Sequence, residues 1–283
     1  MTKFFKLVLI ASTMIALTTG CKDNNGGGDP IKKMIPSEIT YIESYGGHTF
    51  IDGSLISYDD RNRITKVESV SKDEVFHVKD FTYDGTGRLI SITNYHPKGN
   101  SEYVMTFSYS GNSVIVAYDG EEEFAKFELQ NNRLIKSYEL FDDGKELIST
   151  ISYDSRGNAT KIVSDMGEMY ISYENKRGVF SGVNMSSWFL VINQATGWNS
   201  LKFNNVNNPS TIKEVDENRT YLTTYHYEDY DNDYPTKIIV QEDEISLKQS
   251  KVFSFFNRKE KPTRSISGDE YSSHYEIKYI EAK

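Results

Sequence analysis

The chain has 283 residues, 26% of them charged and 37% hydrophobic, an ordinary globular composition that excludes an intrinsically disordered protein. This length suits one large all-β domain or two smaller domains. The formal net charge is -9 and no basic stripe offsets it, which excludes nucleic acid, a polyanion, as a partner. The 20 tyrosines and 15 phenylalanines favour β-strands, because aromatic side chains suit a pleated, half-buried surface.

Residues 1–20 have the pattern of a secretory signal peptide. Lys3 and Lys6 precede an apolar run over residues 7–17, which is shorter than the ~20 residues that a permanent membrane-spanning helix needs. The junction Gly20-Cys21 resembles a bacterial lipobox, and this resemblance implies cleavage before the chain's single cysteine and acylation of Cys21. A simple soluble secreted protein is the alternative.

Residues 21–36 are expected to form a flexible tether that starts at the lipidated Cys21. The run Gly26-Gly27-Gly28 holds neither a helix nor a strand, since glycine-rich segments behave as flexible coils. Lys22-Asp23 resembles the surface-export signal of Bacteroidetes-type lipoproteins, which implies an outer membrane lipoprotein, either surface-exposed or periplasmic. We expect residues 37–283 to form a single domain.

One short phrase recurs through this domain. Its clearest copies begin at Tyr58-Asp59, Tyr83-Asp84 and Tyr153-Asp154, and degenerate copies lie between and after them. The step between copies is about 20 to 30 residues, the length of one β-hairpin and its connection. Gly87 and Gly157 can take the positive φ that such a hairpin turn needs, and Asn62 tolerates it in the first copy.

The repeat predicts an all-β fold. We expect an antiparallel meander of about eight or nine repeated β-hairpins, since residues 37–283 show no convincing helical period. Strand twist accumulates over so many strands, and unpaired edges invite association with other chains. The sheet is therefore expected to curl into a barrel-like or cocoon-like form.

The Tyr-Asp-x-x-Gly-Arg-Leu form at residues 83–89 resembles the YD repeats of the RHS and teneurin type, which implies a hollow β-shell. The lipobox, tether and degenerate repeats together resemble a family of uncharacterised Bacteroidetes-type lipoproteins. That resemblance implies a domain with a porin-like fold and unknown function. Lys, Glu and Ser are frequent in the strands, so "porin-like" is interpreted as a description of shape rather than of insertion into a membrane.

The motifs indicate no catalytic constellation and no cofactor, so no catalytic residue is assigned. None of the five histidines has metal-ligand spacing to another. Asp229, Asp231 and Asp233 resemble the start of a calcium loop, but Tyr234 and Val240 occupy the positions where an EF-hand requires Gly and Glu. These aspartates are a weak candidate for a cation site, and an acidic hairpin tip is the alternative.

The segment Gly178–Leu201 interrupts the repeat, because it contains no charged residue and holds both tryptophans of the chain. Trp188, Phe189 and Trp198 are candidates for an apolar or aromatic binding patch, such as a platform for sugar rings. The alternative is that this segment packs inside the curled sheet as a short helix or strand.

These features favour a non-enzymatic, membrane-anchored lipoprotein of the cell envelope that binds a glycan or another envelope protein. One alternative is a hydrolase acting on polysaccharide or peptide, with carboxylates brought together by the curled sheet. A structural spacer in an envelope complex is the other.

Overall fold

The computed structural model describes residues 32–99, 101–118, 123–141, 144–165, 167–189, 191, 206–216, 219–246 and 272–283. The predicted signal peptide and Cys21 lie outside these residues. The described part belongs to one compact unit. It contains no helix that is both long and apolar enough to cross a bilayer.

Sixteen strands are formed by the described residues. In chain order they are β1 (Met34–Tyr45), β2 (His48–Tyr58), β3 (Ile64–Ser71), β4 (Glu74–Tyr83), β5 (Leu89–Tyr95), β6 (Glu102–Ser110), β7 (Ser113–Tyr118), β8 (Glu123–Gln130), β9 (Arg133–Phe141), β10 (Gly144–Tyr153), β11 (Ala159–Ser164), β12 (Gly167–Arg177), β13 (Asn207–Val215), β14 (Arg219–Asp231), β15 (Tyr234–Ser246) and β16 (Ser272–Glu281).

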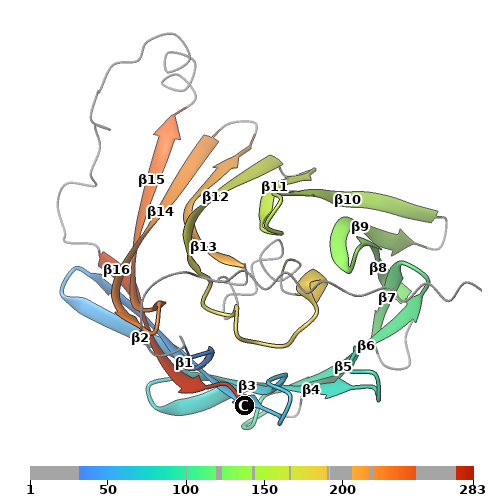
Figure 1. Ribbon diagram of the computed structural model, residues 1–283, viewed down its shortest axis with the longest axis horizontal. Coiled ribbons are helices and arrows are strands. Elements are labelled where there is room, and N and C mark those ends of the chain that lie inside the picture. Colours follow the sequence, from blue (N-terminus) through green and yellow to red (C-terminus); the bar gives the residue numbers. More distant parts are fainter. Residues whose placement is uncertain are drawn as a thin grey trace, which may run out of the picture. The chain divides into compact units, whose positions relative to one another are not determined.

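The strands form a closed antiparallel barrel (Figure 1). Each strand pairs with its neighbours in sequence, and β16 pairs back onto β1 along a ladder from Met34 opposite Glu281 to Ser44 opposite Ser272. Because β1 and β16 each pair with a neighbour on both sides, neither end strand is left as a free sheet edge. The predicted all-β meander and its curling into a barrel are confirmed.

The barrel starts earlier in the chain than predicted. Strand β1 begins at Met34, and the side chains of Met34 and Ile35 are both buried. Residues 34–36 therefore belong to the barrel and not to the tether, because they pair with β16 in the ladder that closes the sheet. The tether signal, a glycine-rich run, ends before this point.

The turns of the repeat have the predicted backbone conformation. Asn62, Gly87 and Gly157 have φ values of 58°, 91° and 100°. In the first turn, Asp59 Oδ1 accepts a hydrogen bond from the backbone N–H of Arg63, and Asp59 Oδ2 accepts one from Arg63 Nε at 2.6 Å. Each copy thus closes its own hairpin with an aspartate that binds the turn backbone.

Seven tyrosines on even-numbered strands of the described part donate a hydrogen bond to a backbone carbonyl oxygen on the preceding strand. They are Tyr58, Tyr83, Tyr109, Tyr153, Tyr173, Tyr227 and Tyr279. We call this ring of residues the tyrosine girdle, and the barrel end at which it lies the tyrosine end. The equivalent position on β8 is Leu129, which pairs with Leu134.

Each girdle tyrosine binds the strand that faces the previous girdle tyrosine, so the girdle links successive hairpins. Tyr58 faces Ile64 in the ladder, and the Ile64 carbonyl accepts the hydroxyl of Tyr83 at 2.7 Å. The guanidinium of Arg63 also lies over the Tyr83 ring, with Cζ 4.4 Å from the ring centroid. At the seam, Tyr279 faces Pro36, whose carbonyl accepts the hydroxyl of Tyr58, so this linkage continues across the junction of β1 and β16.

Residues 178–189 and 191, which we call the plug, cross the interior at the tyrosine end (Figure 1). The backbone N–H of Asn184 donates to the Asn62 carbonyl in the β2–β3 turn at 2.9 Å. Ser187 Oγ donates to the Asn132 carbonyl in the β8–β9 turn at 2.7 Å. The plug is thereby tied to two separate parts of the barrel wall.

Ion pairs between neighbouring strands lie on the outer wall of the barrel. Ile39 is buried in the core, so its neighbour Glu38 points outward, where it pairs with Lys278 at 2.9 Å. Lys161 and Glu168 form a similar cross-strand pair at 2.8 Å. A transmembrane barrel has the reverse arrangement, an apolar outer band around a polar interior.

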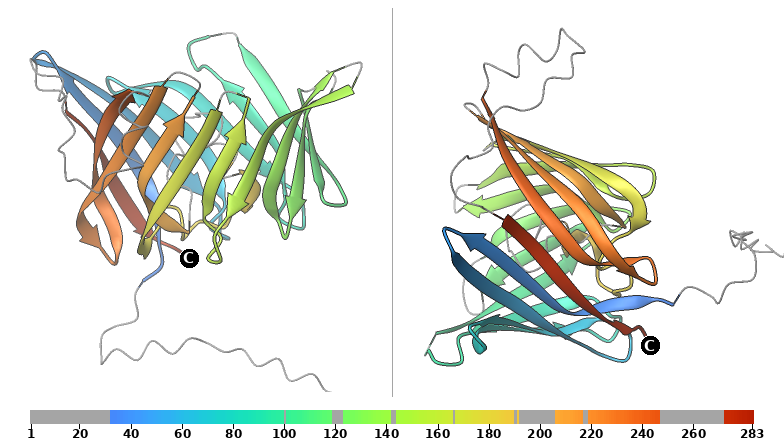
Figure 2. Two further views of the ribbon diagram at one scale, coloured as in Figure 1. Left: turned by 90° about the horizontal axis from the view of Figure 1, so that it is seen from above. Right: turned by 90° about the vertical axis from the view of Figure 1, so that its left-hand side faces the viewer.

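The strands slope across the barrel in the views of Figure 2, as barrel closure requires. The odd-numbered strands start at the tyrosine end and the even-numbered strands finish there. The other end, which we call the opposite end, is where the β1–β2 and β3–β4 connections lie. The candidate site is near the opposite end.

Candidate functional site

The interior holds a cavity of about 450 Å³ near the opposite end. It is lined by residues of β1–β4 and of β14–β16, which are consecutive strands across the junction of β1 and β16. Ligand sites in proteins have volumes of roughly 300 to 1,000 Å³, so the cavity is large enough for a small molecule. We therefore take this cavity as the candidate functional site.

Aromatic side chains form its apolar surface. Ile39 is a core residue, and strand alternation turns Tyr41 to the same inner face. The ladder between β1 and β16 sets Tyr41 directly opposite Tyr275, and their ring centroids are 4.9 Å apart. Tyr225 on β14 adds a third ring, and burial raises the pKa of its hydroxyl above the ordinary range, so it stays neutral.

Charged groups share the cavity with these rings. Asp52 on β2, Lys79 on β4 and Glu242 on β15 all line it. Burial lowers the pKa of Lys79, because desolvation penalises the ammonium form. The cavity thus combines aromatic faces with hydrogen-bonding groups of both signs, which is the composition of a site for a polar ligand that has an apolar face.

A pair of histidines lies at the wall of the cavity. His77 lines it from β4, and the ring of His96, which follows β5, lies with its centroid 5.0 Å away. His96 Nδ1 is 2.8 Å from the Phe76 carbonyl oxygen, so this nitrogen carries a hydrogen and donates it. Burial lowers the pKa of His77, and the positive charge of Lys79 lowers it further, which favours neutral imidazole at pH 7.

Sequence reasoning missed this histidine pair because it tested only spacing along the chain. The hairpin of β4 and β5 sets Val78 opposite Tyr95, which brings the residues flanking that pair together. The signal was present in the turn at Asp84–Gly87, since a hairpin turn fixes the register of the strands that it joins.

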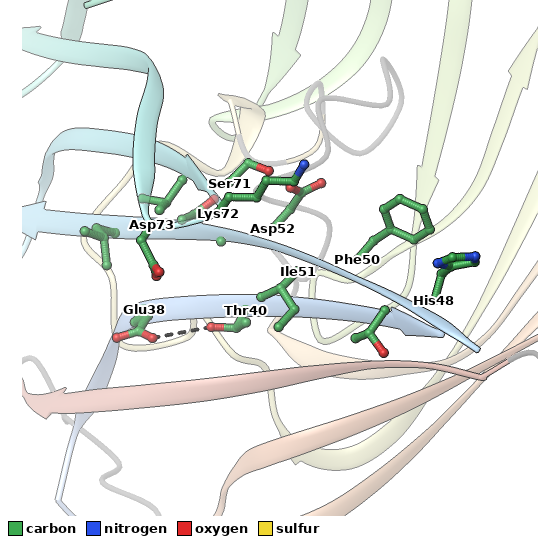
Figure 3. Close-up of a pocket in the computed structure, with 14 residues that line it drawn as sticks. Glu38, Thr40, His48, Phe50, Ile51, Asp52, Ser71, Lys72 and Asp73 are labelled. Carbon is green, nitrogen blue, oxygen red and sulfur yellow. Dashed lines mark hydrogen bonds between the residues drawn. The ribbon is translucent and has the colours of Figure 1, made fainter. Parts of the chain in front are cut away.

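A second hollow, of about 620 Å³, lies beside the first at the β1–β2 hairpin and the β3–β4 turn (Figure 3). Asp52, Gly53 and Ser54 line both hollows. Figure 3 shows the hydrogen bond between Thr40 and Glu38 on one side of this hollow. Phe50 and Ile51 on its wall are 60% and 52% exposed, so part of this hollow is formed by solvent-exposed side chains of β2.

The proposed aromatic patch is not on the surface. Trp188 is 0% exposed and Phe189 is 2% exposed, and the Trp188 ring lies 5.6 Å from that of Phe107 and 5.8 Å from that of Phe127. These residues are the centre of the core at the tyrosine end, so the exposed-platform interpretation is wrong for both. Their packing agrees with the alternative interpretation, in which this segment lies inside the curled sheet. Trp198 lies outside the described residues.

The weak cation site is also contradicted. Asp229, Asp231 and Asp233 belong to the tip of the β14–β15 hairpin, and the described residues contain no cluster of three His, Cys, Asp or Glu side chains that could hold a metal ion. Asp229 and Asp233 have positive φ, and Asp233 pairs with Lys176 at 3.4 Å. The acidic segment forms a turn, in agreement with the alternative interpretation.

Comparisons with known proteins concern the fold. The chain is similar to a porin-like protein from Bacteroides uniformis, with 15% identity, a TM-score of 0.49, and coverage of 86% of this chain and 96% of the other. It is also similar to a porin-like protein from Bacteroides vulgatus, with 10% identity, a TM-score of 0.37, and coverage of 87% and 99%. No protein-family model matches the chain. No curated protein matches it either.

Proposed function

We propose that this protein is a binding module of the bacterial cell envelope, anchored through Cys21, and that the cavity holds a saccharide. The polar outer wall supports a barrel that stands in water beside the membrane, while the signal sequence and lipobox-like junction support the anchor.

The observation that carries the proposal is the composition of the cavity. A sugar ring presents an apolar C–H face, which stacks on aromatic rings, and a rim of hydroxyls, which hydrogen-bond to charged groups. The cavity offers the Tyr41–Tyr275 pair for the first and Asp52, Lys79 and Glu242 for the second.

The test is direct binding of soluble saccharides, measured by calorimetry on the wild-type protein and on Asp52→Asn and Glu242→Gln. Both changes keep the size of the side chain and remove one charge. We expect each variant to weaken binding about tenfold, because a charge-assisted hydrogen bond contributes about 1.5 to 3 kcal/mol. Glu276→Gln on β16 is the matched control, since Glu276 is exposed and next in sequence to the cavity residue Tyr275.

Unchanged affinity in both cavity variants would mean that the saccharide binds outside the cavity. Absence of binding by any saccharide tested would overturn the proposal itself. Thermal melts of each variant check that a loss of binding does not reflect a loss of fold.

A second candidate function is hydrolysis of the bound saccharide. The observation that favours it is that two carboxylates, those of Asp52 on β2 and Glu242 on β15, line the same cavity, and glycosidases use a pair of carboxylates. Incubation of the wild-type protein with each saccharide that it binds, followed by chromatography of the products, tests this. Intact saccharide after prolonged incubation would refute hydrolysis, and binding would remain as the proposed function.

The anchor has its own experiment. Cys21→Ser removes the thiol that acylation requires, so we expect this variant to leave the membrane fraction and lose incorporation of radiolabelled palmitate. Labelling of intact cells with a membrane-impermeant reagent then distinguishes the two sides of the outer membrane. Continued membrane association of Cys21→Ser would contradict the anchor.

A further inference from the structure

Three aromatic side chains form a cluster on the inner face of the barrel, away from the cavity. Tyr118 at the end of β7 stacks on Phe124 near the start of β8, with ring centroids 4.5 Å apart and planes 16° from parallel. Tyr103 near the start of β6 meets Tyr118 edge-on, with centroids 5.8 Å apart. We call these residues the aromatic cluster.

The aromatic cluster and the cavity open toward the same end of the barrel. The start of β6, the end of β7 and the start of β8 lie at the opposite end, as do the cavity residues of β2 and β4. A continuous row of cross-strand neighbours joins them. Lys79 of the cavity faces Asn94 on β5, and Asn94 faces Tyr103. The row therefore leads from the cavity wall to the aromatic cluster along one face of the sheet.

The cluster differs from the tyrosines that hold the barrel together. Members of the girdle donate their hydroxyls to backbone carbonyls, whereas neither Tyr103 nor Tyr118 has a hydrogen-bond partner among the described residues. Tyr103 is 44% exposed and Tyr118 is 36% exposed. Two large rings with free hydroxyls, half-exposed at the mouth of the barrel, are placed to meet a ligand rather than to fill a core.

Asn94, which lies between Lys79 and Tyr103 in this row, has a side-chain oxygen without a hydrogen-bond donor among the described residues. Its side chain is 0% exposed, and its Oδ1 has no partner among the described residues. An unpaired buried amide oxygen costs free energy, so its retention on this row needs a reason. Because Asn94 is fully covered, a ligand that runs along the row reaches this oxygen only when the side chains covering it move aside.

We propose that the aromatic cluster is a second saccharide-binding subsite, which holds further sugar units of an oligosaccharide whose end occupies the cavity. This inference rests on the proposed function and specifies its ligand as a chain of several sugars. From β4 to β8 the sheet spans four strand spacings, roughly 19 Å at about 4.8 Å each, which exceeds the length of one sugar ring. Sugar rings stack on the exposed faces of Tyr103 and Tyr118, and their hydroxyls bind the free phenols.

The test measures affinity against chain length. Glucose and cello-, malto- and xylo-oligosaccharides of two to six units are titrated into the full protein by calorimetry. We expect the wild-type affinity to rise with length in the series that fits. Tyr118→Ala and Tyr103→Ala are each expected to lower the affinity for the six-unit chain about tenfold and to leave the affinity for the shortest bound sugar unchanged.

Two further variants separate stacking from stability. Tyr118→Phe keeps the ring and loses only the hydroxyl, so it should retain most of the length dependence. Tyr170→Ala is the matched control, because Tyr170 is 39% exposed but belongs to an outward-facing position on β12, next to the core residue Ile171. Circular dichroism melts establish that each variant is folded before it is titrated.

The outcomes distinguish the two proposals. Wild-type affinity that does not change with chain length, or Tyr118→Ala and Tyr103→Ala that bind every length as the wild type does, would overturn the subsite and leave the cavity proposal intact. Binding of long chains that is lost in Tyr118→Ala but unaffected by Asp52→Asn and Glu242→Gln would instead support the aromatic cluster and refute the cavity. Failure to bind any length would overturn both.

Discussion

The side chain of Asn62 binds the backbone of Lys283 through both of its polar atoms. Asn62 Nδ2 donates to the main-chain oxygen of Lys283, and Asn62 Oδ1 accepts from its N–H, each at 2.9 Å. The Asn62 carbonyl also accepts the N–H of Asn184 in the plug. One residue with a φ of 58° thus joins the β2–β3 turn, the plug and the segment after β16.

This arrangement predicts a large effect of Asn62→Ala. The substitution removes two hydrogen bonds and the residue's tolerance of positive φ, so we expect the free energy of unfolding to fall by about 2 to 4 kcal/mol in urea denaturation. Asn131→Ala is the control, since Asn131 has a φ of 52° but an exposed side chain without a hydrogen-bond partner among the described residues, and only about 1 kcal/mol should be lost. Equal losses in the two variants would mean that the contact with Lys283 contributes nothing.

Burial of Trp188 in the plug predicts that Trp188→Ala lowers the free energy of unfolding by about 3 to 5 kcal/mol. The reason is the cavity left among Phe107, Phe127 and Phe189, whose rings all contact the indole. Phe141→Ala serves as the comparison, because Phe141 is 49% exposed and its removal should cost little. A small effect at Trp188, measured by circular dichroism during denaturation, would contradict its role in the core.

Close contact between the plug and β1 predicts that Gly182→Ala is destabilising. A Cβ at Gly182 would lie 2.0 Å from the Met34 carbonyl oxygen, so the plug or β1 must move to admit it. We expect a fall of several degrees in the melting temperature. Gly85→Ala, in a turn where an added Cβ meets nothing within 4 Å, should leave the melting temperature nearly unchanged.

The tyrosine girdle predicts graded losses at Tyr83. Tyr83→Phe removes the hydrogen bond to the Ile64 carbonyl and keeps the ring under Arg63, at a cost of about 1 kcal/mol in the free energy of unfolding. Tyr83→Leu also removes the cation–π contact and should cost more. Tyr45→Phe is a matched control with an exposed ring, for which we expect no measurable change by urea denaturation.

The girdle also predicts loss of stability at alkaline pH. Burial raises the pKa of Tyr109 to about 12 in the folded protein, and it raises the pKa values of the other girdle tyrosines still further. In the unfolded chain tyrosine ionises near a pKa of about 10, so between about pH 10 and 12 the unfolded state loses protons that the folded state keeps. This contribution to stability is therefore complete below about pH 10 and is lost as the pH rises toward 12.

Measurement of the free energy of unfolding from pH 8 to about pH 11.5 checks this prediction. The wild-type protein should lose stability steeply over the upper part of the range. A Tyr83→Phe/Tyr109→Phe double variant should show a shallower decline, since two of the titrating groups are gone. Parallel declines in the two proteins would assign the pH dependence to groups outside the girdle.

Local chemistry explains what was predictable. Gly87, Gly157 and Asn62 act within a few residues of themselves, and a turn that needs positive φ selects such residues wherever it occurs. A repeat of hairpins leads to an antiparallel meander, and the need to hide its edges leads to closure. The same reasoning could not place β1 opposite β16, because Met34 and Glu281 are far apart in the chain and only closure pairs them.

The candidate site could not be predicted, because it is formed by contacts between residues that lie apart in the chain. The histidines were visible in the sequence, yet the proximity of His77 and His96 follows from a hairpin register, and Tyr41 meets Tyr275 only at the barrel seam. For Trp188 the composition of its segment was compatible with both a surface patch and a core. By itself, then, the sequence determined strand, turn and curl, because these depend on each residue's own backbone preference and on alternation along a strand. Only the tertiary structure decided which side chains share an interior, because inward-facing positions become neighbours when the sheet closes.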